Sequence, residues 1–384
     1  MILRLSVLVM LLLTAMAQTA PHVMKIAGTV SKIALLSDGT VIGWGDATYG
    51  QLGAVPRASL TRSRYTRQFV RIPLPGKVID IAGGEETSYA LLDGGTVMAW
   101  GRAHDGELGI GTAALEMKQE NLLEGTSQPV AVRGLHDVAA IAAGGRAAYA
   151  ILKDGTVWGW GAISQTPAMT PVQIPGAANV VRIAASGHAL ALTNDGRVMS
   201  WGSNTSGELG RDPQRRQIEQ AGFVEGLRDV VSIATGTQVS LAVKKDGTVW
   251  AWGSNGMGQF GNGKQPERSD AGAWTHTPQL VPGVTNAVSV AASVVGRHVL
   301  ALLKNGTVMG WGNSDWGQTG SGVAGDFQLT PRPARITNVK AVFACGNNSL
   351  AIRSDNSLWI WGNGDRGEFP VNTVTKVPVL VNIY

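Results

Sequence analysis

The sequence is dominated by a unit with a fixed internal spacing. Seven units each contain an alanine followed ten residues later by a Trp-Gly pair. The distance from one of these tryptophans to the next varies from 41 to 60 residues, so rigid units are joined by variable connections. Such self-similarity is typical of repeat architectures, in which each unit packs against its neighbours. The tryptophans are Trp44, Trp100, Trp160, Trp201, Trp252, Trp311 and Trp361, and the alanines are Ala34, Ala90, Ala150, Ala191, Ala242, Ala301 and Ala351.

Each unit has the pattern of four short strands. An Ile-Ala-rich segment ending in glycine comes first, as at 81–83, and an aliphatic segment around the alanine follows. Asp-Gly or Asn-Gly then stands before most Trp-Gly strands, as at 154–155 and 305–306, and these pairs favour tight hairpin turns. A fourth, Pro-containing apolar segment comes before the next unit, as at 129–132. The sequence therefore predicts an all-β fold, a seven-bladed β-propeller of four-stranded antiparallel blades.

The placement of the fourth strand is open at this stage. A copy follows the last unit at 377–381, but none precedes the first unit. If this strand pairs with the unit after it, the C-terminus must reach round to the first blade and close the ring. If it pairs with the unit before it, every blade is formed from local sequence.

The N-terminus has the features of an export signal. A positive charge at Arg4 precedes an apolar run over 5–13, and Ala15-Met16-Ala17 offers a small-residue cleavage site. We expect residues 1–17 to be a signal peptide and 18–384 to form a single propeller. The alternatives are cleavage at Ala20 and an uncleaved anchor. The mature chain is expected to be secreted or periplasmic, without stable membrane insertion.

The seven units resemble the regulator-of-chromosome-condensation repeat family. The resemblance rests on the Leu-Ala-Leu, Asp-Gly, Trp-Gly and Gly-Gln-Leu-Gly elements, with clear copies of the ending at 45–53 and 202–210. The third unit lacks this ending at 161–164. The resemblance implies the propeller fold and, more remotely, guanine-nucleotide exchange and chromatin binding, which an export signal disfavours. The family also includes secreted bacterial propellers that inhibit β-lactamases, and this chain is similar to them in its expected location.

Strand direction predicts where a partner would bind. The turns after the first strands and the loops after Trp-Gly should share one face, and the uniform Asp-Gly turns should occupy the other. Variable loops on a rigid scaffold usually carry function, and large aromatic, Met and Arg side chains dominate protein interfaces. We therefore expect a non-enzymatic protein-binding module, an inhibitor or adaptor, whose partner-binding residues are Tyr49, Asp105, Met257, Trp316, Arg366, Arg297, Arg64 and Trp274.

Other functions receive less support from the sequence. The Arg-rich loop 57–71 could bind an acidic polysaccharide, and Glu85, Glu86 and Asp105 could form a carboxylate group for a glycan hydrolase or lyase. Glu107, Glu208 and Glu368 take the place of glutamines in other units, which indicates a structural hydrogen bond. No metal-ligand spacing or cofactor motif is apparent, so no cofactor is expected. The net charge of +5 is too small to indicate a nucleic-acid partner, and none is expected. Cys345 is the only cysteine, and a monomer is expected.

Overall fold

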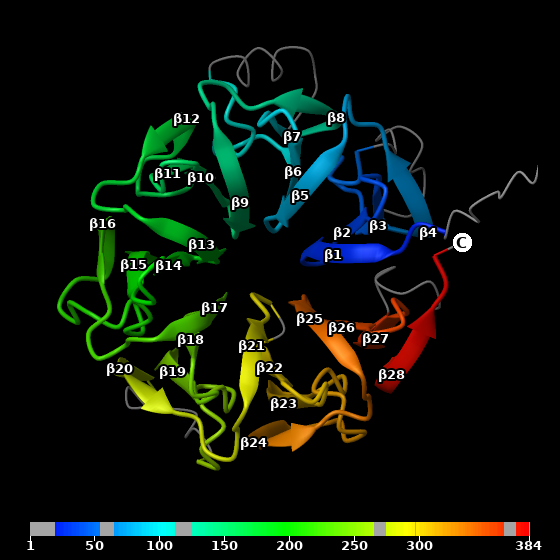
Figure 1. The fold of residues 1–384 in the computed structure, drawn as a ribbon, viewed down its shortest axis with the longest axis vertical. Helices are drawn as coiled ribbons and strands as arrows, with labels where there is room; N and C mark the ends of the chain where they lie inside the picture. Colours follow the sequence, from blue (N-terminus) through cyan, green and yellow to red (C-terminus); the bar gives the residue numbers. More distant parts are fainter. Residues whose placement is uncertain are drawn as a thin grey trace, which may run out of the picture.

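A computed structural model of the chain describes residues 20–53, 65–111, 125–264, 274–295, 297–364 and 374–383. Within these ranges, 28 strands and no helix form seven four-stranded antiparallel sheets around a central axis (Figure 1). The predicted seven-bladed propeller is thus confirmed. The proposed signal peptide, residues 1–17, lies outside the described residues.

The strands of each blade follow one another in sequence from the axis outward. Blades 1 and 2 consist of β1 (Val23–Gly28), β2 (Lys32–Leu36), β3 (Val41–Asp46), β4 (Tyr65–Ile72), β5 (Val78–Gly83), β6 (Thr87–Leu92), β7 (Val97–Arg102) and β8 (Gly125–Ala131). Blades 3 and 4 consist of β9 (Val138–Gly144), β10 (Ala147–Leu152), β11 (Val157–Gly161), β12 (Ala168–Gln173), β13 (Val180–Ala185), β14 (His188–Thr193), β15 (Val198–Ser203) and β16 (Gln217–Phe223).

The remaining blades repeat this order. Blade 5 consists of β17 (Val230–Gly236), β18 (Val239–Lys244), β19 (Val249–Ser254) and β20 (Trp274–Leu280), and blade 6 of β21 (Ala287–Ala292), β22 (His298–Leu303), β23 (Val308–Asn313) and β24 (Phe327–Pro333). Blade 7 consists of β25 (Val339–Cys345), β26 (Asn348–Arg353), β27 (Leu358–Gly362) and β28 (Thr375–Val381).

The fourth strand of every blade pairs with the unit before it, which settles the question that the sequence leaves open. β4 pairs with β3, and β28 pairs with β27, so each blade is formed from local sequence. Blades 7 and 1 consequently meet without strand exchange. Their seam is a hydrophobic cluster in which Trp44 and Leu36 pack with Leu350, Ile360 and Val381.

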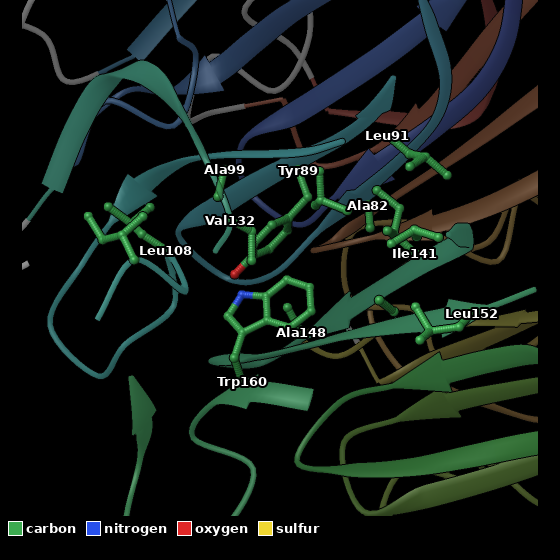
Figure 2. Packing of buried hydrophobic residues seen from close by; sticks show 14 of the residues in the cluster. Ala82, Tyr89, Leu91, Ala99, Leu108, Val132, Ile141, Ala148, Leu152 and Trp160 are labelled. Carbon is green, nitrogen blue, oxygen red and sulfur yellow. The ribbon is translucent and has the colours of Figure 1, made fainter. Parts of the chain in front are cut away.

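The repeated alanines and tryptophans form the contacts between blades. All seven alanines and all seven tryptophans are at most 1% exposed. Figure 2 shows the packing between blades 2 and 3, where Tyr89 and Trp160 meet edge to face with ring centroids 5.8 Å apart. The Tyr89 hydroxyl and the Trp160 indole both donate to the Glu107 carbonyl, at 2.8 and 2.9 Å.

This carbonyl contact recurs around the ring and explains the Gly-Gln-Leu-Gly ending. The indole N–H of one blade donates to the backbone carbonyl of the Gln or Glu in the preceding blade's loop, and this satisfies both buried groups. In several blades a buried serine donates to the same oxygen, as Ser240 does to Glu208 at 2.7 Å. The indole pairs are Trp100–Gln51, Trp160–Glu107, Trp252–Glu208, Trp311–Gln259 and Trp361–Gln318, at 2.7 to 2.9 Å.

Blade 4 lacks this contact because the third unit lacks the loop. Trp201 is fully buried and packs against Tyr149 at 5.6 Å, as Trp160 packs against Tyr89. Its indole Nε1 finds no loop carbonyl; the Tyr149 hydroxyl lies beside it, and the indole N–H partly opposes the rise of the Tyr149 pKa to about 12 that burial causes. Ile163 of blade 3 joins the apolar cluster around Trp201 instead.

A buried histidine joins blades 4 and 5. His188 lies between Ser186 and Ser240, with its Nδ1 3.1 Å from one hydroxyl and its Nε2 2.7 Å from the other. Burial lowers the pKa of His188 to about 4, so the imidazole is neutral at pH 7. His298 makes the corresponding contact to Ser349 between blades 6 and 7, at 2.8 Å.

The seven innermost strands line a central channel of about 270 Å³. Its wall consists mainly of small and aliphatic residues, among them Ala27, Ala82 and Ala185. Lys25 and Asp80 form an ion pair of 2.5 Å across neighbouring blades at this wall. The small residues allow seven strands to converge around one axis.

Candidate protein-binding face

Hydrogen bonds place the turns after the innermost strands and the loops after Trp-Gly on one face, as predicted. The residue at the end of the third strand donates its N–H to the turn of the same blade. Examples are Ser254 to Gln238 at 2.7 Å and Asn313 to Arg297 at 3.1 Å. We call this end of the propeller the variable face. The opposite end, which carries the Asp-Gly turns, is the turn face.

Five described loops of the variable face are held by the same side-chain contact. A Gln or Glu side chain accepts the N–H of the residue two positions earlier, and this closes a small ring around the intervening glycine. The residue whose N–H is held differs from blade to blade. The five pairs are Tyr49–Gln51, Asp105–Glu107, Ser206–Glu208, Met257–Gln259 and Trp316–Gln318, at 2.6 to 2.9 Å.

The intervening glycine also anchors the loop to the next blade. Gly50 has a φ of +85°, and a Cβ built on it would lie 2.6 Å from the backbone nitrogen of Ser127 in blade 2. Only glycine combines this backbone conformation with such a close approach. The loop backbone is therefore fixed from both sides by contacts that do not involve the side chain of the preceding residue. This also confirms that Glu107 and Glu208 have structural roles; Glu368 lies outside the described residues.

Exposed apolar side chains of the variable face are concentrated on blades 5 and 6. Trp274 is 42% exposed at the start of β20, and Trp316 is 37% exposed in the loop after β23. Val295, in the turn after β21, and Val323 are 44% and 55% exposed. Met257 is half-buried, and its neighbour Gly258 packs on Leu329 of blade 6. These side chains form an apolar sector of the type found at the centres of protein interfaces.

Contiguity within this sector follows from backbone contacts. Trp274 pairs with Ser254, which begins the loop that carries Met257. The Ser314 hydroxyl donates to the carbonyl of Val323 at 3.1 Å, which brings the two ends of the Trp316 loop together. The Met257 loop adjoins blade 6 where Gly258 lies against Leu329, so the two blades meet beside this loop. Val295 and Val323 are additions that the repeat pattern does not single out.

A cluster of charges occupies the variable face of blade 2. The Arg102 guanidinium lies 2.8 Å from Glu86, 3.4 Å from Asp105 and 3.4 Å from Glu107. Asp105 also contacts Arg146 at 3.3 Å. The predicted binding residue Asp105 is thus engaged inside the protein, with a side chain that is 18% exposed.

The charges in this cluster are mutually compensated. Burial alone would raise the pKa of Asp105, but the hydrogen bond from His104 and the positive charges of Arg102 and Arg146 hold it below its ordinary value. Burial raises the pKa of Glu107, which is 1% exposed. Glycoside hydrolases use two neighbouring carboxyl groups, one with a raised and one with a lowered pKa, as Glu107 and Asp105 have here. The Glu107 carboxyl is buried, however, so a substrate cannot reach it.

The remaining predicted residues are placed differently. Tyr49 is half-buried, with the Arg102 guanidinium 5.9 Å from its ring centroid. Arg297 is exposed and has a φ of +52° in the turn after β21. Arg64 and Arg366 lie outside the described residues, as does the Arg-rich loop up to residue 64. Of that loop's arginines, Arg67 and Arg71 are described, both exposed on β4.

Two further searches concern only the described parts of the chain. No group of three or more His, Cys, Asp or Glu side chains is arranged to hold a metal ion there. Nor is any helix in those parts long and apolar enough to cross a membrane.

The fold and the face together define a class: propellers that display variable side chains from a repeated, hydrogen-bonded scaffold. A family model described as the regulator of chromosome condensation (RCC1) repeat matches residues 184–208 and 230–259, and a second with the same description matches 246–302. These matches show that the chain contains RCC1 repeats. The narrower resemblance to β-lactamase inhibitors stays a prediction.

Relatives of known name match most of the chain. The E3 ubiquitin-protein ligase HERC2 of Homo sapiens is 28% identical over 367 residues, which cover 88% of this chain but only 7% of HERC2. The ultraviolet-B receptor UVR8 of Arabidopsis thaliana is 28% identical over 362 residues, covering 77% of this chain and 79% of the receptor. The guanine nucleotide exchange factor SRM1 of Saccharomyces cerevisiae is 26% identical over 378 residues, covering 84% and 77%.

Solved structures with the same fold include two propellers. Prp20p of Saccharomyces cerevisiae aligns with a TM-score of 0.76 at 22% identity and covers 94% of this chain and 87% of its own. Human WBSCR16 aligns with a TM-score of 0.74 at 19% identity and covers 89% and 94%. At these identities the likeness concerns the fold.

Proposed function

We propose that the chain is an exported, non-enzymatic binding protein that holds a partner protein on its variable face. The observation that carries this proposal is a loop geometry that is repeated from blade to blade while the residue before its glycine differs. Five loops share one backbone hydrogen bond, yet they present Tyr, Asp, Ser, Met and Trp. A scaffold that fixes the backbone and varies one side chain per blade is suited to recognising an irregular protein surface.

The apolar sector of blades 5 and 6 supplies the expected centre of the interface. Trp side chains contribute disproportionately to binding free energy because they bury a large area in one contact. Trp316 combines an exposed ring with a backbone that Gln318 holds. It is therefore pre-ordered for binding at little cost in conformational entropy.

The related propellers support a protein partner over a small-molecule substrate. Prp20p is described as binding Gsp1p and histones, and another structure shows Kap60 bound to yeast RCC1. An export signal, if present, would expose this chain to different partners from those. Its partner is then an extracellular or periplasmic protein, and the chain would act as an inhibitor or adaptor.

The test is affinity capture from the extracellular fraction of the native host with three immobilised forms. The wild type and a Val172→Ala control, which changes an exposed residue on the outer strand β12, should retain the same partner. Trp316→Ala should reduce its affinity about thirtyfold, as expected of an interface hot spot. The alanine retains the backbone N–H that Gln318 binds, so the melting temperature should stay unchanged. Equal retention by all three forms would contradict the proposal.

Guanine-nucleotide exchange is a second candidate, because SRM1 and a bovine secretion-regulating protein carry that activity in their names. It requires a cytosolic GTPase partner and is therefore incompatible with export. Accelerated release of a labelled nucleotide from a host GTPase, lost in the Trp316→Ala variant, would favour this candidate over the binding role.

A further inference from the structure

The turn face carries a second apolar surface that the variable face does not explain. In all seven blades, the pairing between the innermost strand and its neighbour skips the second residue of the innermost strand, which forms a β-bulge. All seven bulge residues are exposed. They are Met24, Ile79, Ala139, Val181, Val231, Val288 and Lys340.

Five of these residues are Met, Ile or Val with large exposed fractions. Met24, Ile79 and Val181 are 53%, 49% and 55% exposed, and Val231 and Val288 are each 44% exposed. A bulge leaves the extra residue outside the ladder of hydrogen bonds, so its side chain need not join the packing between blades. We call these seven residues the bulge ring.

The bulge ring lies on the turn face. The residue just before each innermost strand accepts an N–H from the residue that follows the second strand, beside the Asp-Gly turn. Examples are Asp137 with Lys153 at 2.9 Å and Asp229 with Lys245 at 2.7 Å. The innermost strands also begin further from the axis than they end (Figure 1), so the ring is wide. Equivalent positions in seven equivalent blades place these side chains at a common height.

Basic residues accompany the ring. Lys340 belongs to it, Arg182 follows Val181, and Lys77 precedes the innermost strand of blade 2. None of these three forms an ion pair with a carboxylate of the described residues, and Lys340 contacts only the amide of Asn356. Around the same strand beginnings, Asp80 is paired with Lys25 and Asp137 with Lys153, whereas Asp229 and the exposed turn carboxylates Asp38, Asp93, Asp154 and Asp246 have no such ion pair among the described residues. The turn face therefore carries both signs of charge, with Lys77, Arg182 and Lys340 as cations at the ring.

We propose that the bulge ring docks the protein peripherally on an anionic lipid surface. A wide ring of apolar side chains at one height fits a flat surface better than it fits a narrow peptide. The unpaired cations complement negatively charged headgroups, whose attraction for nearby Lys and Arg adds to the insertion of apolar side chains. A second copy of the chain would instead bring the same unpaired cations against each other.

The test is co-sedimentation of the purified chain with vesicles. We expect binding to vesicles that contain phosphatidylglycerol, weak binding to pure phosphatidylcholine, and partial release by salt because the charges are exposed. The double variant Val181→Asp/Val231→Asp should lose about tenfold or more in affinity, since it removes two apolar contacts and adds two negative charges.

The chain offers a closely matched control. Leu380 and Val172 are 61% and 44% exposed, comparable with Val181 and Val231, but lie on the outer strands β28 and β12. Leu380→Asp/Val172→Asp changes the net charge equally and should bind vesicles like the wild type. The proposal is overturned if the wild type does not bind anionic vesicles, or if the control loses as much affinity as the ring variant. It is also overturned if the lipid-free wild type is a dimer that the ring variant converts to a monomer.

Discussion

The indole-to-carbonyl contact between blades gives a prediction that compares two positions of the same chain. Trp252 donates to the Glu208 carbonyl at 2.9 Å, whereas Trp201 has no loop carbonyl and only the Tyr149 hydroxyl beside its indole N–H. Both side chains are fully buried. Trp252→Phe and Trp201→Phe remove the same atoms from equivalent sites, so the loss of packing is similar in the two variants.

The difference between the variants reports on the hydrogen bond. Trp252→Phe loses a buried contact that contributes about 1 kcal/mol, although Ser240 still donates to the same oxygen. Trp201→Phe removes a buried N–H that has only the Tyr149 hydroxyl beside it and makes no hydrogen bond of good geometry, so its loss relieves up to about 1 kcal/mol. The free energy of unfolding should therefore fall by about 1–2 kcal/mol more for Trp252→Phe than for Trp201→Phe.

Urea unfolding followed by far-UV circular dichroism measures this difference, provided that the two variants share one m-value. Near-equal losses, or a larger loss for Trp201→Phe, would refute the role we assign to the loop carbonyl. A variant such as Gly210→Ala is unsuitable for this comparison, because it strains the backbone at a φ of +67° and does not isolate the hydrogen bond.

Two further predictions concern charge. The pKa of His188 is about 4 in the folded chain against 6.5 in the unfolded one, so the unfolded state binds the extra proton. The free energy of unfolding of the wild type should fall by about 3 kcal/mol as the pH drops from 6.5 towards 4. The free energy of unfolding of His188→Gln should fall by less over the same pH range. Thermal melts in which both proteins lose stability equally with falling pH would contradict this. Arg102→Gln should destabilise the protein by about 2–4 kcal/mol at pH 7, because it leaves Glu86 and the buried Glu107 without a cation and Asp105 with Arg146. Without Arg102 the pKa values of Asp105 and Glu107 rise in the folded state, so this deficit should shrink as the pH falls below 5, and a pH-independent deficit would count against the cluster.

The architecture could be predicted from the sequence because the residues that determine strand lengths and turns recur in every repeat. The Ala-to-Trp spacing fixes the hairpin, and the Asp-Gly turns fix the strand direction, from which the common face follows. Ring closure could not be predicted in the same way. Pairing of β28 with β27 and pairing of that segment with blade 1 satisfy the same hydrophobic pattern, and only the observed pairing of β28 with β27 in the folded chain distinguishes them.

The binding face could be predicted only in part. The variable position before the glycine is visible in the repeat, so Trp316 and Met257 could be named from the sequence. The role of Arg102 could not, because three carboxylates from two different segments converge on it only in the folded protein. The bulge ring was missed for a similar reason. A valine after a valine reads as ordinary strand sequence, and only the pairing shows that Val181 is skipped.

The scaffold separates the residues that make the fold from those that meet a partner. On the variable face, Gln318 holds the loop through the backbone of Trp316, so the indole ring can change without cost to the fold. On the turn face, the β-bulge leaves Val181 outside the ladder of paired residues, so its side chain is likewise not needed for the strand pairing. Both surfaces consist of side chains that the packing between blades does not require. Because they lie at opposite ends of the axis, a chain docked on lipid through one end would present the other end to a partner protein, and the two proposals can be tested without interfering with each other.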